Sequence, residues 1–177
     1  TRAIELDPAN AWGYYARGNT RYDAGAGAAA LADYRKACEL DPAGQPYARL
    51  GIWLLRAAAG EREAATEELR TFLAGRESTS EDEWYPHLAR FLMGELSAAD
   101  LFERAAAGDD SGAAGRKCDA YYYAGALRLI RRGRPVAQEF RPRSAHARAP
   151  RRPWGSRRAE SGFAQRLTPL ARGARGQ

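Results

Sequence analysis

The sequence is poor in the side chains that most often bind metals or act as nucleophiles. It has two histidines, His87 and His146, and two cysteines, Cys38 and Cys118. Their spacing does not suit zinc, and two cysteines are too few for a disulfide scaffold. We therefore predict no catalytic residue, no metal and no cofactor. The cysteines are interpreted as small buried side chains, with a disulfide between them left open.

Long apolar runs and lysines are also scarce. No apolar run approaches the ~20 residues that a membrane-spanning helix needs. Two lysines stand against 26 arginines, and residues 131–177 hold 13 of those arginines but only two acids. That segment carries +11, which leaves −5 of the net +6 for residues 1–130. The two parts of the chain therefore differ in their electrostatics.

Composition favours helices, and one pattern repeats at a distance of 34 residues. Ala, Leu, Arg and Glu are good helix formers, and β-branched residues are few, so we predict an all-α fold. The segment AIELDPAN begins at Ala3, and ACELDPAG begins at Ala37. The unit that these segments delimit has regularly spaced aromatic and small residues, namely Tyr14, Gly18, Ala30, Tyr34, Ala37 and Pro42.

This period and these positions resemble the tetratricopeptide-repeat (TPR) family. The resemblance implies antiparallel helices over 11–24 and 27–40, stacked with further pairs into an α-solenoid. Gly25 and Gly27 would separate the two helices of this pair. Arg17 stands where the motif has a leucine.

Further units follow with less regular spacing. Tyr47, Gly51 and Ala65 mark a second unit, in which the last two residues are two positions further apart than Gly18 and Ala30. Tyr121 and Gly125 mark the first helix of a third unit. The predicted organisation begins with the end of a truncated repeat at 1–10, a repeat at 11–42 and a degenerate repeat at 43–76. A loop and two short non-repeat helices follow at 77–117 and end in a turn-rich linker at 108–115. The first helix of an incomplete repeat at 118–133 and a basic tail at 134–177 complete it.

The order of these units resembles a narrower group. Two repeats are followed by three short motifs: Trp84-x-Pro86, Phe91-Leu92-x-Gly94 and Cys118-x-Ala120-Tyr121-Tyr122-Tyr123-x-Gly125. This order is similar to that of bacterial NlpI-like TPR lipoproteins. The resemblance implies an adaptor at the cell envelope or periplasm, associated with the envelope if a lipoprotein signal precedes the chain. A cytoplasmic location is the alternative.

The repeat pattern stops within the third unit. From residue 134 the sequence has several prolines, no helical period and little aliphatic content, so we predict disorder. Three origins stay open: a frameshift, a genuine disordered tail, and a basic arm for nucleic acid or an anionic surface. Arginines neutralise phosphates, but no nucleic-acid-binding fold signature accompanies them, so nucleic acid is the less favoured partner.

TPR proteins bind peptides on a concave face lined by the first helix of each unit. The resemblance therefore implies a binding groove formed by Trp12, Tyr15, Asn19, Tyr22, Asp23, Arg49, Ile52 and Arg56. For Tyr15 and Tyr22, packing against the next unit is the alternative. Because of the two arginines, we expect a protein or peptide partner of some acidic character.

The predicted function is thus a protein–protein adaptor that binds a peptide or partner helix. Two alternatives are a repeat module of a larger enzyme, and binding of nucleic acid or an anionic surface through the arginine-rich tail. Because fewer than three complete units are present, we expect low stability.

Overall fold

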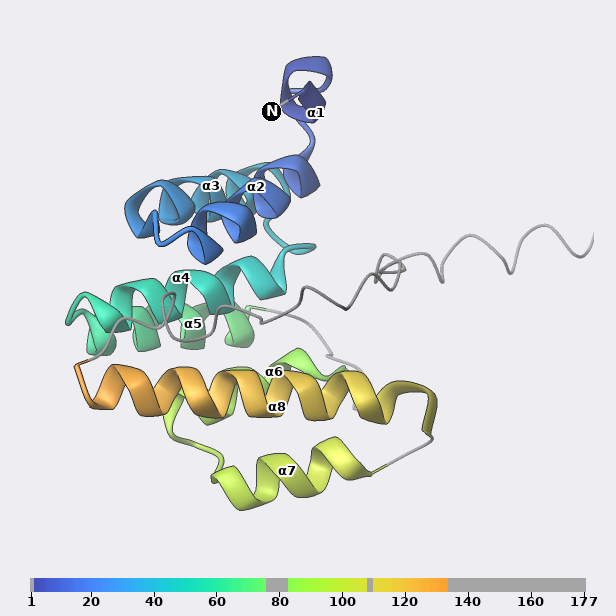
Figure 1. Ribbon diagram of the computed structural model, residues 1–177, viewed down its shortest axis with the longest axis vertical. Coiled ribbons are helices and arrows are strands. Elements are labelled where there is room, and N and C mark those ends of the chain that lie inside the picture. Colours follow the sequence, from blue (N-terminus) through green and yellow to red (C-terminus); the bar gives the residue numbers. More distant parts are fainter. Residues whose placement is uncertain (1, 76–82, 108–109, 134–177) are drawn as a thin grey trace, which may run out of the picture. The chain divides into compact units, whose positions relative to one another are not determined.

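The computed structural model describes residues 2–75, 83–107 and 110–133, and all regular structure in these ranges is helical (Figure 1). The helices are α1 (Arg2–Leu6), α2 (Ala11–Asp23), α3 (Gly27–Leu40), α4 (Pro46–Ala58), α5 (Arg62–Ala74), α6 (Tyr85–Met93), α7 (Ala98–Ala106) and α8 (Asp110–Arg131). The prediction of an all-α fold is confirmed for these residues. None of the described helices is long and apolar enough to span a bilayer. The predicted tail at 134–177 lies outside the described residues.

Local sequence signals set several helix ends. The side chain of Asn10 caps α2, and that of Ser97 caps α7, where each accepts a hydrogen bond from the backbone N–H three residues on. Gly25 and Gly60 have φ angles of 78° and 90° in the turns after α2 and α4. Such left-handed backbone strongly favours glycine.

The two extra residues of the second unit lie in a helix and not in a turn. α2 extends five residues beyond Gly18, whereas α4 extends seven beyond Gly51, and each following turn has three residues. α4 is therefore longer between Gly51 and the turn, and the turn has the same length as the turn after α2.

α8 begins earlier than the sequence predicts. Residues 108–115 were expected to form a linker, but the helix starts at Asp110 and includes Gly112 and Gly115. Ala113 is buried, and Arg116 donates to the carbonyl of Ala107 after α7. Contact between α7 and α8 thus overrides the low helix propensity of the two glycines.

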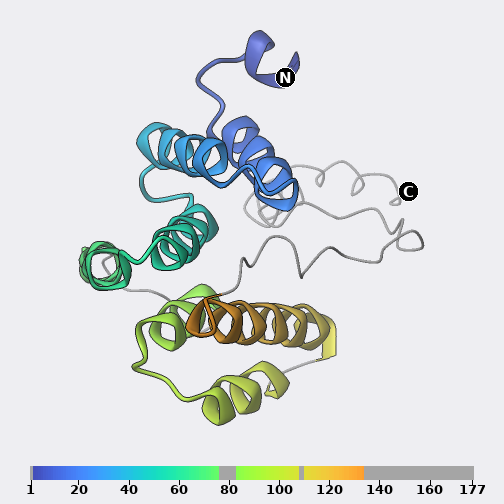
Figure 2. The ribbon, with the colours of Figure 1, turned by 60° about the vertical axis from the view of Figure 1, so that its left-hand side comes forward.

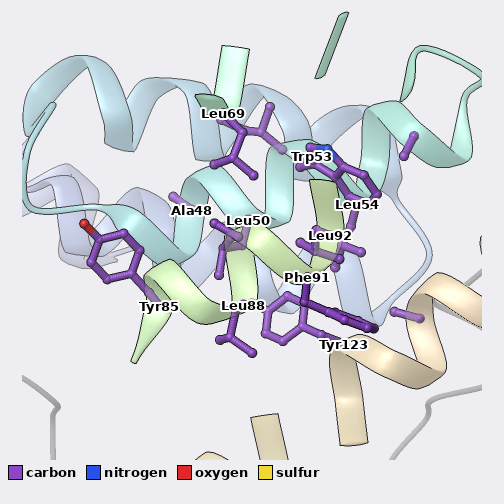
Figure 3. Packing of buried hydrophobic residues seen from close by; sticks show 14 of the residues in the cluster. Ala48, Leu50, Trp53, Leu54, Leu69, Tyr85, Leu88, Phe91, Leu92 and Tyr123 are labelled. Atoms are coloured by element: carbon purple, nitrogen blue, oxygen red, sulfur yellow. The ribbon is translucent and has the colours of Figure 1, made fainter. Parts of the chain in front are cut away.

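α4 lies at the centre of the core formed with α5, α6 and α8. It contacts α3, α5, α6 and α8, and Figure 3 shows its side chains together with those of α6 and α8. The largest fully buried side chains are Trp53, Leu50, Leu88, Leu92 and Leu101. The Trp53 indole N–H also donates to the Thr66 hydroxyl of α5 at 3.1 Å. α6, α7 and α8 contact one another in all three pairings, as Figure 2 also shows.

Candidate protein-binding surface

One side of α2 carries a stripe of aromatic and amide side chains. Trp12, Tyr15, Asn19 and Tyr22 recur every three or four residues, which places them on one helical face. The Trp12 ring is 55% exposed and lies 5.2 Å from the Tyr15 ring, between centroids. The hydroxyl of Tyr34 in α3 donates to Asn19 Oδ1 at 2.8 Å, so this amide oxygen is already bonded within the fold.

α4 and α8 bring further tyrosines to the same side of α2. The hydroxyls of Tyr22 and Tyr122 lie close enough to shift each other's pKa. The Tyr47 hydroxyl donates to Asp119 Oδ2 at 3.4 Å. We call the half-buried side chains Tyr15, Tyr47, Tyr122 and Asp119 the tyrosine surface. The buried rings of Tyr22, Tyr34 and Tyr123 are their close neighbours.

The tyrosine hydroxyls are held neutral. Burial raises the pKa of Tyr22 to about 12, and burial is also the main cause of the raised pKa of Tyr34, Tyr47, Tyr122 and Tyr123. The surface therefore presents aromatic rings and uncharged hydroxyls near neutral pH.

Asp119 is the acid of this surface. Burial raises the pKa of its carboxyl, and the hydrogen bond from the Tyr47 hydroxyl opposes this rise. Among the described residues no arginine or lysine forms an ion pair with it. Asp23, at the end of α2, is exposed and lies close enough to Tyr22 and Tyr122 to raise their pKa.

A second buried acid, Asp33, has a different environment. Its side chain is buried, and its carboxylate accepts from Arg17 at 2.7 and 2.9 Å and from Arg21 at 2.8 Å. Arg17, which stands at the position of the motif leucine in the sequence prediction, therefore has a structural role in pairing with Asp33. Arg17 and Arg21 tie α2 to α3 and are engaged away from the tyrosine surface.

The predicted groove residues of α4 lie elsewhere. Ile52 is only 4% exposed, and Arg56 is paired with Glu61 and Glu68. The Arg49 guanidinium lies over the Phe72 ring, 4.0 Å from its centroid. Ile52 is therefore buried in the fold, whereas the binding roles of Arg49 and Arg56 stay predictions for side chains engaged on the α5 side of α4.

Tyr22 also differs from its predicted place in an exposed groove. It is 7% exposed, and its hydroxyl lies near Tyr122 of α8, which is outside the next repeat unit. Tyr15 is half-buried, which fits both a place in the groove and packing against the next unit. Trp12, Asn19 and Asp23 keep partly or fully exposed side chains on α2.

The predicted structural positions are mostly tightly packed. The buried ones are Ala30, Tyr34, Ala37 and Ala65. Two glycines, Gly18 and Gly51, each approach the Tyr34 ring. Half-buried are Tyr14, Tyr47 and Gly125, and Pro42 is exposed. Tyr121 is an exception, since it is 68% exposed and stacks on Phe102 at 4.8 Å between centroids. Its neighbours Tyr122 and Tyr123, together with Asp119, reach the tyrosine surface instead, and the sequence reasoning missed them.

The described part of the chain holds no other obvious chemical site. An open depression of about 660 Å³ lies between α4 and α5, lined by Arg49, Ala64, Glu67, Glu68, Thr71 and Phe72. Its two glutamates already pair with Arg70 and Arg56. Within the described ranges no group of His, Cys, Asp or Glu is placed to hold a metal ion. Cys38 is buried and Cys118 exposed, and both are free thiols.

No family model matches this chain, and no curated protein or solved structure matches it either.

Proposed function

We propose that this chain is a protein-binding module of the tetratricopeptide-repeat type, an adaptor that binds a polypeptide segment on the tyrosine surface. The 34-residue period supports the repeat assignment. So does the equivalence of the pairs α2–α3 and α4–α5, each joined by a three-residue turn with a left-handed glycine. Stacking of such pairs would form an α-solenoid. A location at the cell envelope stays a prediction from the resemblance.

The observation that carries the proposal is the convergence of tyrosines from α2, α4 and α8. Tyr15, Tyr47 and Tyr122 are far apart in sequence, yet they form one partly exposed surface. Tyrosine combines a large rigid ring with a polar hydroxyl, and it is enriched at protein interfaces. A surface of this composition buries apolar area against a partner at little cost in side-chain entropy.

A peptide-display screen against the full chain tests this proposal. We expect Tyr15→Ser and Tyr122→Ser to weaken binding of the selected peptides by about tenfold or more, because truncation of an interface tyrosine commonly costs over ~1 kcal/mol. Tyr121→Ser is the matched control, since this neighbouring tyrosine is exposed on another side of α8 and contacts Phe102. Peptides that bind both surface variants as well as the unaltered chain would refute the tyrosine surface as the binding site.

A further inference from the structure

We propose that the tyrosine surface binds an arginine side chain from a basic segment of a partner protein, and that Asp119 is the carboxylate that pairs with it. This inference rests on the proposed function and specifies the chemistry of the partner. It assigns to Asp119 a recognition role in addition to its hydrogen bond with Tyr47.

The first argument is the contrast between the two shielded aspartates. Asp33 is surrounded by two guanidinium groups, which compensate the cost of removing its charge from water. Among the described residues, Asp119 accepts from a neutral donor, the Tyr47 hydroxyl. A half-buried carboxylate without a cation gains more from an incoming guanidinium than a fully hydrated carboxylate does, because it is screened less by water.

The second argument is the aromatic surround of Asp119. Tyr47 and Tyr123 lie near this carboxylate, and Tyr15 lies near both of these tyrosines. The faces of tyrosine rings attract cations. A guanidinium is planar, stacks on aromatic rings and donates two parallel hydrogen bonds to one carboxylate, so arginine fits this combination better than lysine.

The third argument is the charge around the surface. Residues 1–130 together carry −5. Arg49 and Arg56, which had suggested an acidic partner, are engaged on the α5 side of α4. The potential at the tyrosine surface therefore attracts a basic segment and repels an acidic one.

The experiment extends the peptide-display screen. The full chain and its Asp119→Asn variant are each screened with the same random peptide library. Asparagine keeps the shape and one acceptor oxygen of Asp119, removes its charge and replaces the other oxygen with an NH2 group. Glu103→Gln on α7 is the control, because it makes the same change in net charge at an exposed position. Circular dichroism of each variant verifies that the helices are retained.

We expect peptides selected by the unaltered chain and by Glu103→Gln to be enriched in arginine over the library. Asp119→Asn should abolish this enrichment and weaken binding of the arginine peptides by about tenfold or more, the usual size of a charged hydrogen-bond contribution. Selected peptides that depend on Tyr15 and Tyr122 but show no arginine enrichment, or that bind Asp119→Asn within twofold, would overturn this inference and leave the proposed function intact. A screen whose peptides ignore the tyrosines would instead reject the proposed function.

Discussion

The ring of Tyr34 lies between two glycines, and this contact yields the sharpest test of the fold. A Cβ added at Gly18 of α2 would lie 2.7 Å from Tyr34 Cδ1 and Cε1. A Cβ added at Gly51 of α4 would lie 2.7 Å from Cε2 on the other edge of the same ring. The ring is rigid, its hydroxyl is bonded to Asn19, and it is 3% exposed, so it cannot move away from either glycine without breaking other contacts.

The expected magnitude for Gly18→Ala is a difference of two terms. Alanine in a helix interior is favoured over glycine by about 1 kcal/mol. Overpacking of a filled core costs about 1–3 kcal/mol. Because the Tyr34 ring is confined on both sides, we expect the upper part of that range and a net loss of about 1–2 kcal/mol of unfolding free energy.

Urea unfolding followed by circular dichroism measures this loss. Gly112→Ala in α8 is the control, since its added Cβ meets only the end of the flexible Arg116 side chain, and it should stabilise the chain by up to about 1 kcal/mol. Replacing Tyr34 with leucine should remove most of the cost of Gly18→Ala, because the two changes share one contact. A Gly18→Ala chain that is as stable as the unaltered chain, or more stable, would refute the close packing of α2 on α3.

Three further predictions concern single side chains. Arg17→Met leaves Asp33 with one arginine and should cost about 2 kcal/mol in the same urea assay, less than full removal of a buried partner; an unchanged urea midpoint would argue against this ion pair. Cys118 is exposed and should react with a thiol reagent in the native chain. Cys38 is buried, and burial raises its pKa to about 11, so it should react only after denaturation. Reaction of both thiols in one step would contradict the packing of α3. The Tyr22 pKa of about 12 exceeds the ordinary value of 10. The neutral Tyr22 hydroxyl therefore stabilises the fold fully below pH 10, and this stabilisation is lost as pH rises from 10 through 12. The urea midpoint of Tyr22→Phe should fall less steeply over this window than that of the unaltered chain.

The sequence predicted the features that depend on neighbours close in the chain. The repeat at 34 residues placed Gly18, Ala30 and Tyr34, and these residues meet across one helix pair. The turn glycine Gly25 and the capping serine Ser97 act within a few residues of their positions. Such signals are local, and a sequence pattern is sufficient to locate them.

The tyrosine surface depended on contacts that a sequence pattern does not contain. Three consecutive tyrosines at 121–123 fit any face of a helix, so their sequence does not show which two point inward. Asp119 meets Tyr47 across 72 residues of chain. The sequence also did not show that Arg49 and Arg56 are engaged on the α5 side of α4. α4 is packed on several sides, so its apolar periodicity does not distinguish the side that faces α5 from the side that faces α8.

The position of α8 also has a consequence for the order of folding. The contacts α2–α3, α3–α4 and α4–α5 join helices that are adjacent in sequence, and such local contacts form quickly because little loop entropy is lost. The contact of α4 with α8 joins helices that are separated in the chain by α5, α6 and α7, so more loop entropy is lost when it forms. Until α8 docks, the sides of α4 and α6 that it contacts remain uncovered. A chain emerging from the ribosome would therefore pass through a stage with exposed apolar side chains, in which binding by a chaperone competes with completion of the fold.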